Sequence, residues 1–135
     1  MDTRLVIAKK AYEKGYTCSQ AVFCAYAGDM GIDEKTACRI MEGFGGGIGG
    51  MQEVCGALSA ASAVISYYCS TGKPEGRQDT YRVVRKAAEK FKHEYCGVTC
   101  REILRGERPQ AFRCSMKVKD TVLIIESLLK EENLR

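Results

Sequence analysis

A glycine-dense loop that leads into a long uncharged segment dominates the middle of the chain. Six of the eight residues from Gly43 to Gly50 are glycine. Glycine tolerates positive φ angles and lets the backbone approach a neighbour or a ligand closely, but it loses more conformational entropy on folding than any other residue. The loop therefore serves either close packing of the backbone or the cradling of a bound group.

Cys55 follows this loop at the start of the uncharged segment. If a helix opens at Met51 or Gln52, Cys55 falls in its first turn, where free amides and the positive end of the helix dipole favour a thiolate. We interpret it as a reactive or metal-binding cysteine, although cysteine also packs as a small buried hydrophobe. The glycines expected to cradle a cofactor are Gly45, Gly46, Gly47 and Gly56.

The length and the cysteine content of the chain indicate its cellular compartment. With 135 residues, the chain fits one domain, residues 1–135, which can bury a core without disulfides. The eight cysteines are therefore not needed as structural staples. The charged N-terminal residues do not form a signal peptide, so a cytoplasmic, reducing location is expected. In that setting repeated cysteines indicate metal binding or redox chemistry.

The charge pattern restricts the partners. The net charge of +4 comes from 21 Lys and Arg against 17 Asp and Glu, dispersed along the chain, so no nucleic-acid partner is expected. The range Val54 to Gly72 is uncharged but rich in Ser, Ala and Gly, which predicts a buried central helix and no membrane insertion. Small residues on the surface of such a bundle would also suit a homodimer.

Helical patterns fill the chain, and no convincing strand is found. Thr17, Asp33 and Thr99 are the expected N-caps of three helices. Another helix covers Gly76 to Tyr95, and the last is expected to run from about Cys114. The apolar face predicted for the helix at 76–95 consists of Tyr81, Val84, Ala88, Phe91 and Tyr95. Together these patterns predict an all-α, single-domain helical bundle of about five to seven helices.

The cysteines divide into two groups by their place on these helices. Four stand at or near predicted helix starts, where backbone amides stabilise anionic sulfur: Cys18, Cys55, Cys100 and Cys114. The other four lie inside helices or at their ends and are interpreted as packing residues: Cys24, Cys38, Cys69 and Cys96. No two of the helix-start cysteines are close in sequence, so the fold would have to bring them together.

The helix-start cysteines carry a family resemblance over nearly the whole chain. Cys18, Cys55-Gly56-Ala57, Cys100-Arg101-Glu102 and Cys114 together resemble a family named for its C_GCAxxG_C_C pattern, which is assumed to be redox-active. The central motif reads Cys55-Gly56-Ala57-Leu58-Ser59-Ala60, with Ala60 where the family has its last glycine. The resemblance implies four characteristic cysteines, a mostly helical fold and redox chemistry.

Three classes of function remain open. The preferred one is electron transfer by an iron-sulfur cluster bound to Cys18, Cys55, Cys100 and Cys114, because four thiolates are the usual ligands of such a cluster. In the second, the same cysteines cycle as thiols and disulfides without metal. The third is a helical binding module with structural zinc or with no site. The first two would require an electron-transfer or thiol partner.

Overall fold

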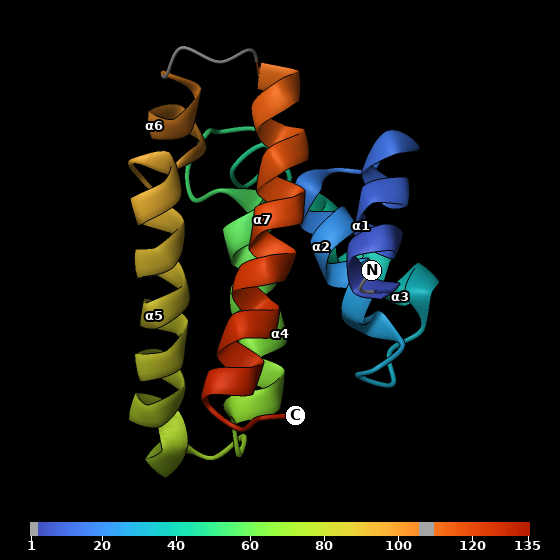
Figure 1. The fold of residues 1–135 in the computed structure, drawn as a ribbon. Coiled ribbons are helices and arrows are strands. Elements are labelled where there is room, and N and C mark those ends of the chain that lie inside the picture. The colour runs from blue at the N-terminus through green and yellow to red at the C-terminus, as the bar shows by residue number, and fades with distance from the viewer. Residues whose placement is uncertain (1–2, 106–109) are drawn as a thin grey trace.

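Helices build the fold, which confirms the predicted all-α class (Figure 1). The computed structural model describes residues 3–105 and 110–135, and for 110–114 it describes the helix but not the side chains. Within these ranges there are no strands, only an isolated antiparallel bridge between Val54 and Thr99. The helices are α1 (Thr3–Glu13), α2 (Cys18–Ala27), α3 (Glu34–Met41), α4 (Gly56–Cys69), α5 (Arg77–Tyr95), α6 (Cys100–Leu104) and α7 (Gln110–Glu131), with 3-10 turns η1 (Glu42–Phe44) and η2 (Pro74–Gly76).

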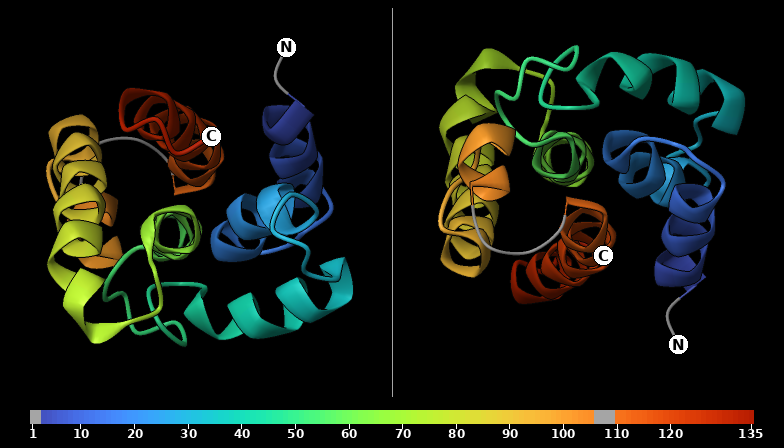
Figure 2. Two further views of the ribbon diagram at one scale, coloured as in Figure 1. Left: turned by 90° about the horizontal axis from the view of Figure 1, so that it is seen from below. Right: turned by 90° about the horizontal axis from the view of Figure 1, so that it is seen from above.

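Helix α4 occupies the centre of the bundle, as its uncharged sequence predicts. It packs against α2, α5 and α7, which surround it in the views along the bundle (Figure 2). Its alanines at 57, 60 and 61 are fully buried, so neighbouring helices approach its backbone closely. The predicted opening at Met51 or Gln52 is wrong. Gln52 has a positive φ of 60°, which no α-helix accommodates, and Cys55 is the N-cap.

Local capping chemistry fixes the starts of α2, α3 and α6, where the predicted caps are confirmed. The Thr17 and Thr99 side chains each accept a hydrogen bond from the third residue of their helix and complete a capping box. Asp33 accepts one from the Thr36 N–H. Each threonine cap is followed directly by a cysteine, so Cys18 and Cys100 are the first residues of their helices.

The buried face of α5 differs from the predicted one. Val83, Ala87 and Phe91 are fully buried, whereas Tyr81 is 49 % exposed. Because α5 contacts both α4 and α7, its buried face is set by where these two neighbours meet, which the helical period cannot specify. Helix α7 also begins at Gln110, four residues before the predicted start, so Cys114 lies in its second turn.

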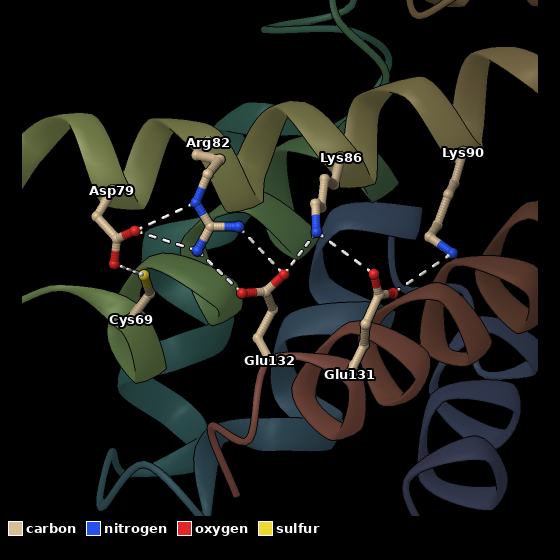
Figure 3. Close-up of polar contacts among 7 residues, drawn as sticks. All are labelled: Cys69, Asp79, Arg82, Lys86, Lys90, Glu131 and Glu132. Atoms are coloured by element: carbon tan, nitrogen blue, oxygen red, sulfur yellow. Dashed lines mark hydrogen bonds and ion pairs between the residues drawn. The ribbon is translucent and has the colours of Figure 1, made fainter.

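Ion pairs join the end of the chain to α5 (Figure 3). Arg82 and Lys86 both bind Glu132, at 2.9 and 2.7 Å, and Lys86 also lies 3.3 Å from Glu131. These contacts join the C-terminal end of α7, and the residue that follows it, to α5. In the described ranges, no helix has the length and apolar character required to cross a bilayer.

Candidate functional site

The glycine loop closes on itself before it reaches α4. Four of its glycines have positive φ: Gly46, Gly47, Gly49 and Gly50. A Cβ atom on Gly47 would lie 2.6 Å from the backbone nitrogen of Glu53, so the loop can return across this point only without a side chain. The Glu53 N–H donates to the Gly47 carbonyl at 2.9 Å, and the Gln52 N–H donates to Gly46 at 2.9 Å. Close backbone packing therefore explains these two glycines.

The end of the loop is bonded to the start of α6. The Cys55 N–H donates to the Val98 carbonyl at 2.9 Å, and the Cys100 N–H donates to the Glu53 carbonyl at 2.7 Å. The Arg101 N–H donates to Gln52 at 3.0 Å. These bonds flank the bridge between Val54 and Thr99 and bring the segments of Cys55 and Cys100 together. The loop carbonyls accept hydrogen bonds from the first two amides of α6, so these amides are not free to stabilise an anionic sulfur at Cys100.

Gly56 makes room for Cys18 beside the start of α4. A Cβ atom at this position would lie 2.8 Å from the Phe44 carbonyl oxygen and 3.1 Å from the sulfur of Cys18. The absence of a side chain thus lets α2 bring Cys18 against the first residue of α4. There the Cys18 thiol forms a hydrogen bond with the sulfur of Cys55. Two of the predicted site cysteines are therefore in direct contact.

Lys117 of α7 places a positive charge against Cys55. Its Nζ atom donates to the Cys55 sulfur at 3.5 Å, and both residues are 0 % exposed. Because a charge buried without a counter-charge is very unfavourable, a lysine at this position indicates an anionic neighbour. The site thus joins a cysteine at the start of α4 to an ammonium from α7, with the thiol of α2 beside them.

The surroundings of Cys55 favour its thiolate. The hydrogen bond from Cys18 contributes most to lowering the pKa of Cys55 to about 6, and the Lys117 charge acts in the same direction. The N–H groups of Ala57 and Leu58, in the first turn of α4, also lower this pKa, while burial opposes them. Cys55 is therefore largely ionised at neutral pH although it is buried.

Tyr95, at the end of α5, lies close enough to Cys55 for the negative charge of its thiolate to raise the pKa of the tyrosine. Its hydroxyl donates to the Asp120 carboxylate at 2.5 Å. Burial raises the pKa of Tyr95 most, the bond to Asp120 raises it further, and the negative charges of Glu94 and Cys55 add smaller contributions. The phenol of Tyr95 therefore stays neutral at physiological pH.

The other two predicted site cysteines are Cys100 and Cys114. Cys100 is buried, and its segment is bonded to that of Cys55. Cys114 lies three residues before Lys117 in α7, and its side chain is outside the described part of the structure. Across the described residues, no group of three or more His, Cys, Asp or Glu side chains is arranged to hold a metal ion. That the four cysteines share one centre stays a prediction, as does cofactor binding by Gly45, Gly46, Gly47 and Gly56.

The remaining cysteines do not all pack as predicted. Cys96 is exposed and caps α5 in the left-handed conformation, with φ of 61°, so its interpretation as a packing residue is wrong. Cys69 lies 3.9 Å from the Asp79 carboxylate (Figure 3). Cys24 and Cys38 are part of the α2–α3 contact, where their sulfur atoms are 2.8 Å apart.

Lys117 is the functional residue that sequence reasoning missed. A signal was present, because Lys117 stands four residues before Thr121 and eight before Ile125, and both of these residues are buried. A lysine in register with the buried stripe of a helix must be neutralised or paired. Because most lysines lie on the protein surface, the spacing of Lys117 with the apolar residues of this helix is a weak signal by itself.

These observations define a class: a small all-α protein with a buried cysteine thiolate stabilised by a second thiol and a lysine. The chain belongs to the family described as "Putative redox-active protein (C_GCAxxG_C_C)", whose model matches residues 16–128. This range includes the whole site and confirms the resemblance found in the sequence. Comparisons with curated proteins and with solved structures gave no match.

Proposed function

We propose that the protein is a thiol-disulfide redox protein whose active pair is Cys18 and Cys55. The contact of the Cys18 thiol with a Cys55 sulfur that accepts a hydrogen bond from Lys117 carries this proposal. A stabilised thiolate beside a second thiol is the arrangement that thiol-disulfide exchange requires. Cys18 is half-buried and Cys55 fully buried, so Cys18 is the sulfur that a partner reaches first.

The exchange follows from this difference in exposure. The Cys18 thiol passes its proton to the Cys55 thiolate, and the resulting Cys18 thiolate attacks one sulfur of the partner's disulfide. The first partner sulfur leaves as a thiol after taking up a proton, and Cys18 is held in a mixed disulfide. Cys55 then loses its proton, attacks the Cys18 sulfur and releases the second partner thiol. The Cys18 thiol and the Cys55 thiolate become one disulfide, one proton is taken from solvent, and one partner disulfide becomes two thiols.

Trapping the mixed disulfide tests this order. With glutathione disulfide as the probe, the Cys55→Ser variant is expected to keep a glutathione adduct on Cys18, because the thiol that would displace it, Cys55, is missing. The wild-type chain should instead form a Cys18–Cys55 disulfide, located by fragmentation mass spectrometry. A Cys69→Ser variant is the control and should behave as wild type. If Cys18 stays unmodified in the Cys55→Ser variant, or pairs with another cysteine in the wild type, the proposal is wrong.

An iron-sulfur cluster for electron transfer is the second candidate, as preferred from the sequence. Cys18, Cys55, Cys100 and Cys114 would hold it. The bonding of the Cys100 segment to that of Cys55 and the positive charge of Lys117, which would offset the charge of four thiolates, favour this candidate. When bound, the cluster would supply one-electron transfer. The exchange reaction is placed first because the contacts of Cys18, Cys55 and Lys117 support it without a bound group.

Metal analysis separates the candidates. Protein purified without air is assayed for iron, acid-labile sulfide and zinc, and its visible spectrum is recorded. Iron together with sulfide supports the cluster, and zinc supports a structural zinc site. A reduced chain that contains neither metal supports the exchange chemistry of Cys18 and Cys55.

We also infer the compartment, the partner and the oligomeric state of the protein. The cytoplasm suits a protein with eight cysteines whose domain size does not require disulfides. The partner would be a thiol or electron-transfer protein, and the bundle would form a homodimer. Size-exclusion chromatography with light scattering measures the last point, and a monomer at all concentrations would contradict it.

A further inference from the structure

A second pair of cysteines lies between α2 and α3, apart from Cys18 and Cys55. The sulfur atoms of Cys24 and Cys38 are 2.8 Å apart, less than one ångström longer than a disulfide bond of about 2.05 Å. Cys24 is six residues after Cys18, which places the two about 9 Å apart along the axis of α2. The two pairs are thus distinct, and none of the chemistry proposed above uses this one.

Buried hydrogen bonds hold the two helices in register around this pair. The Ser19 hydroxyl donates to the Met41 carbonyl at 2.8 Å, and the Gln20 side-chain amide donates to the carbonyl of Cys38 itself at 2.8 Å. Both donors are buried polar side chains on α2. Because they fix the backbone of α3 against α2, the sulfurs are held together by the fold and not by a chance rotamer of one side chain.

Solvent reaches the pair through a cavity between α1, α2 and α3. The cavity has a volume of about 700 Å³, and both Cys24 and Cys38 line it. Cys38 also borders a second hollow of about 530 Å³, together with Gln20 and Lys35. Cys38 is half-buried, whereas Cys24 is buried. A small reagent can therefore reach the sulfur of Cys38 before it reaches that of Cys24.

The charges around the pair support this division of roles. Burial raises the pKa of Cys24 to about 12, with further contributions from Cys38 and then from Glu34, so Cys24 stays a thiol. Lys10 and Lys14 of the α1 segment line the same cavity, as do Arg4 and Asp29, which bind each other. The two lysines favour the entry of an anionic reagent into this cavity, which Glu34 also lines.

From this geometry we propose that Cys24 and Cys38 form a second, reversible disulfide, made by exchange with a small anionic disulfide that enters the cavity between α1, α2 and α3. Cys38 loses its proton and attacks one sulfur of the small disulfide, and a first small thiol is released. Cys24 then loses its proton, attacks Cys38 and releases the second small thiol. Two protein thiols are oxidised to one disulfide, and one small disulfide is reduced to two thiols.

Glutathione disulfide is the probe for the test, used on the full chain. The Cys18→Ser variant is the background, because its Cys18–Cys55 pair cannot form and the result therefore reports on this pair alone. After incubation and alkylation, a peptide that links Cys24 to Cys38 and has lost two hydrogen atoms is expected. A reducing agent should restore both thiols.

Two further variants assign the order of attack. Adding Cys24→Ser should leave a lasting glutathione adduct on Cys38, because the thiol that displaces it is missing. Adding Cys38→Ser should leave Cys24 unmodified, because Cys24 is buried. Far-UV circular dichroism confirms that each variant is folded. If Cys38 is unmodified in the first variant, or if no linked peptide forms in the Cys18→Ser background, the proposal is overturned, whatever happens at Cys18 and Cys55 in the wild type.

Discussion

The Nζ atom of Lys117 lies 3.5 Å from the sulfur of Cys55, and both side chains are fully buried. In water such a pair would be worth little, but inside the bundle each charge depends on the other because solvent does not reach either of them. Helix α7 therefore contributes directly to the chemistry of a cysteine 62 residues earlier in the chain. The strength of this coupling can be measured.

Replacing Lys117 by Met should raise the pKa of Cys55. The variant loses a positive charge within hydrogen-bonding distance of the sulfur, and an opposite charge at this range moves a pKa by about 1 to 3 pH units. The pKa of about 6 in the wild type should therefore move toward that of an ordinary thiol. The ultraviolet absorbance of the thiolate, recorded against pH, measures this. Lys119→Met, which removes an exposed lysine two residues away, is the matched control.

The same substitution has a predictable effect on stability. Because the pKa of Cys55 is lowered from 9.0 to about 6 in the folded protein, its ionisation adds stability that is full above about pH 9 and lost as the pH falls through 6. The Lys117→Met variant should thus lose more stability at pH 9 than at pH 6. Urea denaturation of the wild type and the variant at pH 9 and at pH 6 measures this difference in the free energy of unfolding. An equal loss at both pH values would mean that Lys117 acts through packing alone.

Much of the fold could be predicted because its signals are local. Thr17, Asp33 and Thr99 cap their helices through side-chain bonds to residues three positions on, and such bonds depend on sequence spacing. The start of α4 could not be predicted in this way. Gln52 takes a positive φ because the loop returns across Gly47, and this path is set by contacts with α6.

The site was only partly predictable because its key contacts are between distant segments. The caps gave the positions of Cys18 and Cys100 at helix starts, and the glycines pointed to the segment of Cys55. The burial of Lys117 depends on α4 and α7 lying side by side, and the pairing of Cys24 with Cys38 depends on α2 meeting α3. The spacing of Lys117 with the buried residues of α7 indicates that it is buried, but no spacing along the chain encodes its contact with Cys55 or the contact of Cys24 with Cys38.

Alanine substitutions at Gly47 and Gly49 separate close packing from backbone strain. Both residues have positive φ, 77° and 57°, but only a Cβ on Gly47 meets other atoms, at 2.6 Å from the Glu53 nitrogen. Gly49→Ala should cost about 1 to 2 kcal/mol from strain. Gly47→Ala should cost a further 1 to 3 kcal/mol or so, because backbone must move. Urea denaturation at one pH measures both, and equal losses would show that the loop relaxes at Gly47.

Glu132 should make the protein sensitive to acid. Hydrogen bonds from Arg82 and then Lys86 lower its pKa to about 2, from 4.5 (Figure 3). The stabilisation is therefore present above about pH 4.5 and is lost as the pH falls toward 2. Thermal unfolding between pH 6 and pH 3 should show a smaller drop in midpoint for Glu132→Gln than for wild type. Glu131→Gln, which changes the more exposed neighbour, should keep the wild-type pH dependence, and a loss of that dependence in both variants would contradict the assignment.

Oxidation of the pair between α2 and α3 should stabilise the fold. A bond between Cys24 and Cys38 closes a loop of about 15 residues, and in the chain-entropy description such a loop adds about 3 kcal/mol by restricting the unfolded chain. The sulfurs are already 2.8 Å apart, and Ser19 and Gln20 already fix the backbone around them, so oxidation needs little movement. Urea denaturation of the oxidised and the reduced Cys18→Ser variant compares the two states. In a chain that also carries Cys38→Ser, treatment with the oxidant should leave the free energy of unfolding unchanged. An oxidised form that is no more stable than the reduced one would show that the helices must shift to make the bond, and that the register set by Ser19 and Gln20 belongs to the dithiol state alone.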